Sequence, residues 1–146
     1  SCGELARLRQ EGKIRHVGIS NVDAGQLEQV RAIVRVVSVQ NRYNVADRSS
    51  EPVLAACERH GIAFIPWSPL SRNPSDPRDS NAASRDALGR WAQERGISQP
   101  QAAIAWLLAR SPAMLPIPGT SKVAHLEENV AAAAVRLTAA EMQQIG

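Results

Sequence analysis

The chain has 146 residues, of which 44% are hydrophobic and 21% charged, a composition typical of one globular domain with a sizeable core. Its formal net charge is +3, without a block of lysine and arginine, and only 3% of its residues are aromatic. These features argue against nucleic-acid binding, which needs a basic surface and, for single strands, a stacking platform.

Apolar runs and cysteines exclude further classes of protein. The longest apolar runs, such as 102–109, are too short for a membrane span, and residues 1–10 lack the apolar core of a signal peptide. Cys2 and Cys57 lack the spacing of a zinc site, and two reduced thiols are favoured over a disulfide between them. We expect a cytoplasmic protein that binds no metal, no nucleic acid and no membrane.

Four short segments rich in branched apolar residues alternate with helical patterns along the chain. They are residues 14–20, 34–40, 63–67 and 114–118. Strands that alternate with helices indicate βα units and a parallel sheet. The pattern leaves two architectures open, which are half of an eight-stranded barrel and a small open sheet.

Capping signals mark the predicted helices. An opening helix is expected to end at Gly12, and another to begin at Ser49 or Ser50 and end at Gly61. The spacing of a capping box, in which two residues three apart satisfy each other's backbone amides, occurs three times. The pairs are Asp23 with Gln26, Ser98 with Gln101, and Thr138 with Glu141.

The segment 71–83 interrupts this regular alternation. It is polar, contains two prolines and has no periodicity. A loop of this length in a compact domain is either functional or disordered. It follows the third predicted strand, where barrel enzymes keep ligand-binding loops.

Polar, aromatic or glycine-rich residues follow each predicted strand, at the ends where barrel enzymes hold their ligands. Serine, asparagine and glutamine can bind a carboxamide, a tryptophan can stack on an aromatic ring, and a Gly-Thr-Ser turn before a helix can bind phosphate. Each group also has an ordinary structural role, so the prediction depends on their occurrence together. The strand ends are Ser20 and Asn21, Gln40 and Asn41, 67–70, and 119–122.

Four longer runs closely resemble the aldo-keto reductases, in family order and at family spacing. They are EGKIRHVGISN at 11–21, VQNRYN at 39–44, GIAFIPWSPL at 61–70 and PIPGTSKVAHLEENV at 116–130. The resemblance covers essentially the entire chain. It implies an α/β fold that is half of a (β/α)8 TIM barrel, family strands five to eight, with four parallel βα units and flanking helices in a single unit over residues 1–146.

The family reduces aldehydes and ketones by hydride transfer, so the resemblance implies NADP as cofactor and a small carbonyl substrate for the complete protein. It also assigns positions to each part of the cofactor. Ser20, Asn21 and Gln40 would bind the carboxamide, Trp67 would stack on the nicotinamide ring, and Ser68 and Leu70 would contact the pyrophosphate. The positions for the ribose and its 2′-phosphate are Gly119, Thr120, Ser121, Lys122 and His125, and those for adenine are Glu128 and Asn129.

The resemblance has departures at the 2′-phosphate. Some members of the family carry a lysine where Gly119 stands and an arginine where His125 stands, and both bind the 2′-phosphate. Lys122 can supply that charge as a point-charge phosphate ligand. We therefore expect a preference for NADP over NAD that depends on Lys122.

No catalytic residue is expected in this chain. The family's catalytic Asp, Tyr, Lys and His lie on its first four strands, and nothing here corresponds to them. Tyr43 is the only tyrosine, and its place in the 39–44 run indicates a structural role. We expect an oxidoreductase's cofactor-binding half that is inactive alone. The alternative is a non-catalytic NADP(H)-binding or structural module that self-associates.

Half a barrel would leave two strand edges unpaired, at 14–20 and at 114–118. Unpaired edges invite pairing with another chain. We therefore expect either a homo-oligomer or association with a missing N-terminal half. Because the sequence begins at Ser1 inside a family helix, we expect a truncated or processed form.

Overall fold

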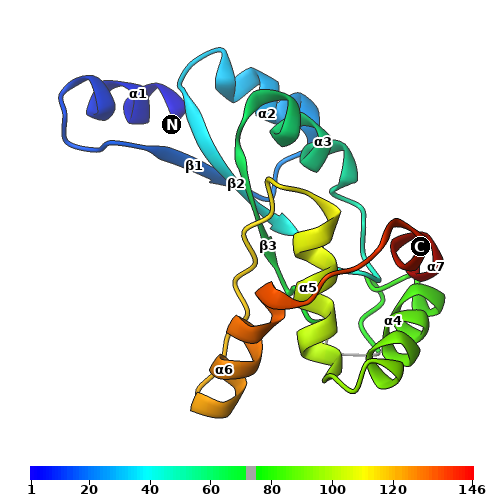
Figure 1. Ribbon diagram of the computed structural model, residues 1–146. Coiled ribbons are helices and arrows are strands. Elements are labelled where there is room, and N and C mark those ends of the chain that lie inside the picture. Colours follow the sequence, from blue (N-terminus) through cyan, green and yellow to red (C-terminus); the bar gives the residue numbers. More distant parts are fainter. Residues whose placement is uncertain (72–74) are drawn as a thin grey trace.

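The computed structural model describes residues 1–71 and 75–146 (Figure 1). In chain order the elements of this part are α1 (Cys2–Gln10), β1 (Val17–Ser20), α2 (Ala24–Arg31), β2 (Val36–Arg42), α3 (Glu51–His60), β3 (Ala63–Trp67), α4 (Ala82–Glu94), α5 (Gln99–Arg110), α6 (Val123–Ala131), a short 3₁₀ helix (Ala132–Ala134) and α7 (Ala139–Ile145). The alternation of strands and helices confirms the predicted βα units.

The sheet of the described residues is parallel, with strand order β1-β2-β3, and so has one strand fewer than predicted. Residues 114–118 run beside β3 but join it only through an isolated bridge between Phe64 and Met114. The amide of Phe64 bonds to the carbonyl of Ala113, so the next donor from β3 would be Pro66, which has no amide hydrogen. The prediction of a fourth strand is therefore wrong, and the fold is a partial α/β barrel with three paired strands.

β1 begins later than predicted but ends at the predicted residue, and β2 begins and ends later than predicted. β3 has the predicted bounds. Val34 does not enter β2, because its amide bonds back to the carbonyl of Val30 at 2.9 Å and closes the turn after α2. β2 instead continues to Arg42, whose register partner is Trp67 on β3. The carboxyl end of β2 therefore lies directly beside that of β3.

The helix ends largely follow the predicted signals. α3 ends at Gly61, which adopts the left-handed conformation with φ 61°. At Ser98 the hydroxyl accepts a bond from the amide of Gln101 at 3.3 Å, without the reciprocal bond of a capping box. The other two predicted boxes form with both bonds, at Asp23 with Gln26 and at Thr138 with Glu141.

The core lies between the sheet and the helices that follow β2 and β3. Tyr43, which comes directly after β2, is fully buried between the rings of Phe64 and Trp106, with ring centroids 5.8 and 6.1 Å away. Its hydroxyl donates a hydrogen bond to the carboxylate of Glu51. Burial raises the pKa of the Tyr43 hydroxyl. These contacts agree with the structural role expected for this tyrosine.

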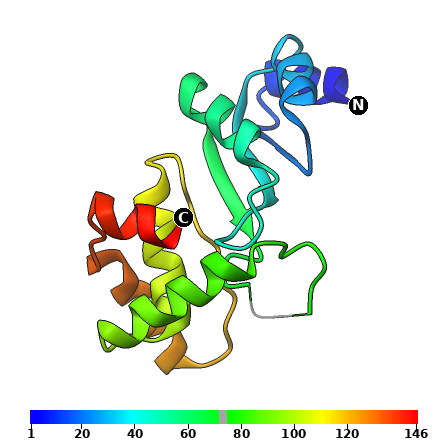
Figure 2. The same cartoon turned by 90° about the vertical axis from the view of Figure 1, so that its right-hand side faces the viewer.

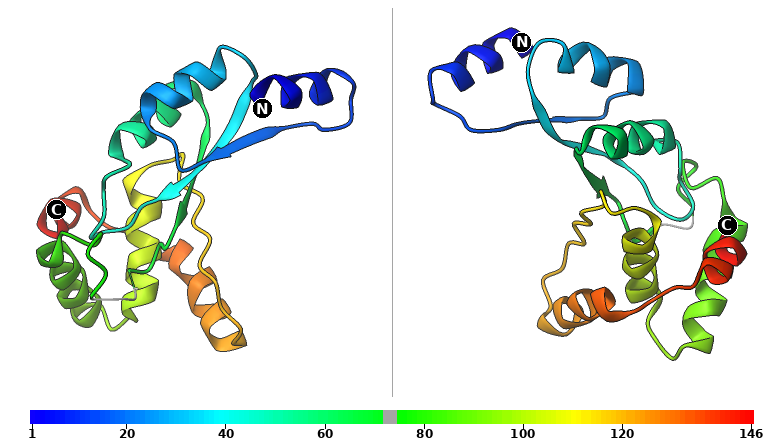
Figure 3. Two further views of the ribbon diagram at one scale, coloured as in Figure 1. Left: turned by 180° about the vertical axis from the view of Figure 1, so that it is seen from behind. Right: turned by 45° about the horizontal axis from the view of Figure 1, so that its top comes forward.

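The molecule is elongated, because its first and sixth helices project from the body (Figures 1 and 3). Neither α1 nor α6 has a fully buried residue. On α6 the apolar side chains of Val123, Leu126 and Val130 are 73%, 55% and 68% exposed. By contrast α4, α5 and α7 pack against one another in the part of the molecule where β3 ends (Figure 2). Along the described residues, no helix combines the length and the apolar character needed to cross a membrane.

Candidate functional site

The first two strand ends meet through a shared backbone oxygen. Ser20 and Gln40 are register partners in the β1–β2 pair. The Ser20 hydroxyl donates to the carbonyl oxygen of Gln40 at 2.8 Å, and the amide of Asn21 donates to the same oxygen at 3.0 Å. Asn21 has φ 55°, a left-handed conformation that asparagine adopts more readily than most residues. This turn fixes where the Asn21 side chain leaves the strand.

Trp67 joins this group from the end of β3. Its indole Nε1 donates to the side-chain oxygen of Asn21 at 2.9 Å, so a bond spans from β3 to the end of β1. Trp67 is half-buried, which leaves part of the ring accessible. The structure therefore brings together Ser20, Asn21, Gln40 and Trp67, which we call the strand-end patch. Hydroxyl and amide groups beside an aromatic ring suit a flat ligand that carries an amide.

Asn41, which the strand-end pattern also singled out, has a structural role. Its side chain accepts from the amide of Val22 at 3.1 Å and donates to the carbonyl of Val22 at 2.7 Å. It also donates to the Ser50 hydroxyl at 3.2 Å, and it is buried. Asn41 thus ties the β1–α2 connection to the start of α3 and holds the strand-end patch in place.

The predicted pyrophosphate segment lies next to the predicted phosphate loop. Residues 68–71 and 117–119 line a pocket of about 240 Å³. Ser68 has φ 54° and Ser71 has φ 47°, both in the left-handed region. Such conformations cost about 1–3 kcal/mol each and concentrate at functional sites. Ser68, Leu70 and Gly119 are therefore brought to one pocket.

The remaining predicted cofactor residues line the start of α6. The Thr120 hydroxyl accepts from the amide of Lys122 at 3.1 Å, and Ser121 and Lys122 are exposed. His125 is half-buried. Glu128 is exposed, and its carboxylate accepts from the Ser98 hydroxyl at 3.4 Å.

Asn129 provides the other polar group on this part of α6. Its side-chain nitrogen is buried and has no partner among the described residues. We call residues 119–129 the α6 segment. Of its residues, only Gly119 lines the pocket that residues 68–71 also line.

A buried ionic network beside Trp67 was missed from the sequence. The Arg42 guanidinium donates to Asp47 at 2.7 Å, to Asp79 at 2.6 Å and to Asp76 at 3.1 Å. Only sign complementarity between position 42 and positions 76 and 79 hints at these contacts, and no local pattern links residues so far apart. The carboxylate–guanidinium contact with Arg78 holds the pKa of Asp76 well below its usual range.

The same network includes part of the segment 71–83, which was expected to be either functional or disordered. Its described part is anchored to β2 rather than lying free, and α4 begins at Ala82 within the predicted loop. The Ser71 hydroxyl also donates to Asp79. Residues 72–74 of the predicted loop lie outside the described residues. The anchored part borders a second pocket, of about 590 Å³, whose wall includes Arg42, Trp67 and Arg78.

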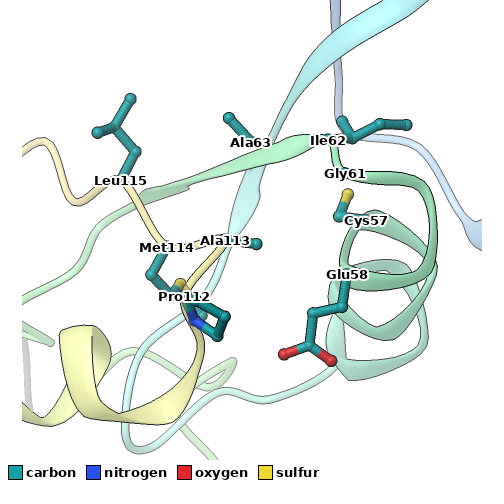
Figure 4. Close-up of a pocket in the computed structure, with 9 residues that line it drawn as sticks. All are labelled: Cys57, Glu58, Gly61, Ile62, Ala63, Pro112, Ala113, Met114 and Leu115. Carbon is teal, nitrogen blue, oxygen red and sulfur yellow. The ribbon is translucent and has the colours of Figure 1, made fainter.

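A further pocket lies at the opposite end of the sheet. Figure 4 shows it between the end of α3, the start of β3 and residues 112–115. The pocket has a volume of about 430 Å³. Its wall is mainly apolar, and burial raises the pKa of the Cys57 thiol to about 11. A thiol with so high a pKa is not a nucleophile at neutral pH. In barrel enzymes this amino-terminal end of the strands serves stability, so the candidate site is the carboxyl end.

Known proteins resemble this chain over nearly all of its length. The whole chain, residues 1–146, matches the aldo/keto reductase family. An uncharacterized oxidoreductase of Schizosaccharomyces pombe is 46% identical over 135 residues, which cover 92% of this chain and 42% of the relative. The pyridoxine 4-dehydrogenase of Escherichia coli is 42% identical over 134 residues, which cover 92% and 44%.

Solved structures give the same result. The thermostable aldo-keto reductase Tm1743, in complex with the inhibitor epalrestat, has a TM-score of 0.86 at 30% identity over 99% of this chain and 54% of its own. An aldo/keto reductase from Klebsiella pneumoniae in complex with NADP and acetate has a TM-score of 0.78 at 27% identity, over 95% and 50%. The chain thus spans about half the length of these relatives. The βα fold and the match over all its residues show that the chain belongs to the aldo/keto reductase family.

Proposed function

We propose that this chain is the cofactor-binding half of an NADP-dependent oxidoreductase that reduces aldehydes or ketones. The observation that carries the proposal is the strand-end patch, in which Trp67 and Asn21 are joined at 2.9 Å across the width of the sheet. Residues 68–71, which follow Trp67 directly in the chain, line a pocket together with residues 117–119, so a second candidate binding surface begins where β3 ends. The Klebsiella pneumoniae neighbour, crystallised with NADP, supports the choice of cofactor.

Each part of the surface has a role in the proposal. Ser20, Asn21 and Gln40 bind and orient the carboxamide, and Trp67 stacks on the nicotinamide ring. Ser68 and Leu70 contact the pyrophosphate, in the pocket that Gly119 also lines. The chemistry that NADPH supplies when bound is the transfer of a hydride to the substrate carbonyl carbon. The chain's own residues hold the ring at a fixed tilt and exclude water from one of its faces.

The α6 segment completes the cofactor site in this proposal. Thr120, Ser121 and Lys122 bind the ribose and its 2′-phosphate near the start of α6, where the helix dipole favours an anion. Lys122 is exposed and supplies the charge for the 2′-phosphate. His125, Glu128 and Asn129 lie further along the helix, and the buried side-chain nitrogen of Asn129 is a donor suited to an adenine nitrogen.

The chain is proposed to be inactive by itself, because carbonyl reduction also needs a proton donor at the carbonyl oxygen. The only tyrosine, Tyr43, is fully buried and donates a hydrogen bond to the Glu51 carboxylate. We propose that the donor belongs to an N-terminal half that this chain does not contain. The uncovered apolar side chains of α6 and the single bridge at Met114 support association with such a half or with a second copy.

A titration with a turnover assay tests the proposal. Calorimetry should detect NADPH binding to the 146-residue chain, with weaker binding of NADH. The chain alone should not oxidise NADPH in the presence of a reactive aldehyde, nor reduce NADP⁺ in the presence of pyridoxine, the alcohol named for the Escherichia coli relative. Absence of binding heat with both NADPH and NADH contradicts the proposal. Turnover by the chain alone contradicts its inactivity, and a compact 15.8 kDa monomer in light scattering contradicts association with a second copy.

A further inference from the structure

Arg42 is a buried cation at the end of β2 that none of the predicted site roles includes. The residue is 7% exposed, and its register partner on the neighbouring strand is Trp67. Its guanidinium binds Asp47 through Nε and Asp79 through Nη2, at 2.7 and 2.6 Å. Bonds from two different nitrogens of a planar guanidinium fix the plane of the group, which a lysine ammonium cannot do.

The carboxylates around Arg42 are themselves held in place. Asp79 accepts from the side chain of Asn44 at 3.2 Å and from the Ser71 hydroxyl. Asp47 accepts from the amide and the hydroxyl of Ser49 at 3.0 and 2.7 Å. The guanidinium is therefore the centre of a network that joins the end of β2, the loop before α3 and the described residues before α4.

This fixed guanidinium lies against the ring of Trp67. The Arg42 Cζ is 5.3 Å from the ring centroid, and the Cζ of Arg78 is 5.7 Å from it. The edge of the same ring is bonded to Asn21 at 2.9 Å. A cation over the ring and a bond at its edge constrain the tilt and the rotation of the indole separately. Without Arg42, only the Asn21 bond and the guanidinium of Arg78, whose side chain is 59% exposed, would hold the ring.

We infer that Arg42 is a positioning residue, which sets the plane of Trp67 so that the indole accepts the nicotinamide ring. The inference rests on the proposed function and adds a residue that acts on the cofactor through Trp67. Arg42 uses its donors on carboxylates of the chain, so its effect on the nucleotide is indirect. Stacking depends on ring orientation, and a small misplacement at the reacting ring is costly.

The test uses Arg42→Lys, which keeps the charge and removes the planar fork. Two ligands are titrated, NADPH and adenosine 2′,5′-bisphosphate, which has the adenine and the 2′-phosphate but lacks the nicotinamide. We expect the Kd for NADPH to rise roughly fivefold or more, because base–aromatic stacking contributes that much or more per ring. The Kd for the bisphosphate should stay within roughly twofold, since its contacts lie on the α6 segment.

The chain offers a matched control in Arg48→Lys. Arg48 is also stacked on a tryptophan, with its Cζ 4.8 Å from the ring centroid of Trp106, but that ring is in the core. The control should leave the ratio of the two Kd values unchanged. The nucleotide-free Arg42→Lys chain should also lose near-ultraviolet dichroism from Trp67, and this loss should be absent in a Trp67→Phe background.

Each outcome separates the two proposals. If the unmodified chain binds neither ligand, the proposed function fails, and the inference fails with it. If the unmodified chain binds NADPH and Arg42→Lys leaves its Kd unchanged, or weakens both ligands equally, the positioning role is wrong and the proposed function stands. A selective loss for NADPH without any change in the nucleotide-free dichroism points to direct contact with the nucleotide, which also overturns the positioning role.

Discussion

The strand-end patch and the α6 segment are proposed to bind opposite ends of one cofactor, yet the chain holds them very differently. The patch is built on register-paired strands, with hydrogen bonds that link β1, β2 and β3. The α6 segment follows residues that touch the sheet at a single bridge, and its helix carries exposed apolar side chains. In the proposed function, the nicotinamide end is therefore organised by this chain itself, whereas the adenine end would be completed by a second half or a second copy.

The largest expected effect comes from breaking the network that supports the patch. Arg42→Met leaves the buried carboxylates of Asp47 and Asp79 without their cation, and removing one partner of a buried ion pair costs about 3–5 kcal/mol. Urea denaturation should show this loss in the free energy of unfolding. The contrasting variant is Arg7→Met in α1, whose ion pairs are exposed, and it should leave the midpoint unchanged. Equal midpoints for the two variants would contradict the difference in rigidity.

The α6 segment is tested through its charge. Lys122→Ala should weaken NADPH binding by roughly tenfold, because charge-assisted bonds to phosphate are stronger than neutral ones. NADH, which lacks the 2′-phosphate, should bind as before. Calorimetry with both nucleotides measures the change in preference. A loss of the same size for NADH would show that Lys122 acts on something other than the 2′-phosphate.

Helix capping offers a smaller contrast. Asp23 caps α2 through both bonds of a capping box, whereas Lys122 at the start of α6 makes no side-chain cap. Asp23→Ala should therefore lower the free energy of unfolding by about 1 kcal/mol, measured by urea denaturation. The conservative variant Asp23→Asn retains the cap and should restore most of the stability.

The smallest expected effect is a pH dependence that lies outside both regions. Glu141, in the capping box of α7, has its pKa lowered to about 2, chiefly by the backbone amide of Thr138 and then by Trp91 and Arg95. A depressed carboxyl pKa contributes stability that is present above the unfolded value of 4.5 and is lost as the pH falls toward 2. Glu141→Gln should flatten the change in the urea midpoint between pH 5 and about pH 3. A slope equal to that of the unmodified chain would contradict this role.

The sequence predicted the parts of the fold that depend on local patterns. β3 has its predicted bounds because turn residues border a short apolar run. Gly61 ends α3 because glycine, which has no Cβ, adopts the left-handed conformation without strain. The prediction of a fourth strand failed because the apolar composition of 114–118 was weighed without the missing amide hydrogen of Pro66, the next donor on the facing edge of β3. Composition indicates burial, but a sheet ladder also needs donors.

The site was predictable only in its strand-end members. Ser20 and Trp67 are the last residues of β1 and β3, and Gln40 lies beside Ser20 on β2, so their positions follow from the predicted strands. Family resemblance supplied their proposed roles. The bond between Asn21 and Trp67 could not be predicted, because it spans two strand pairs and depends on the φ of a single residue. The same holds for Arg42, whose partners at 76 and 79 lie far along the chain and are brought to it only by the fold.

The central claim is that Trp67 presents its ring to a nicotinamide, and tryptophan fluorescence tests it most directly. Trp91 and Trp106 are buried, so a stacked nicotinamide should quench mainly Trp67. We predict saturable quenching by NADPH in the unmodified chain and its loss in Trp67→Phe, with adenosine 2′,5′-bisphosphate giving no quenching in either. Saturable quenching that persists unchanged in Trp67→Phe would contradict the account.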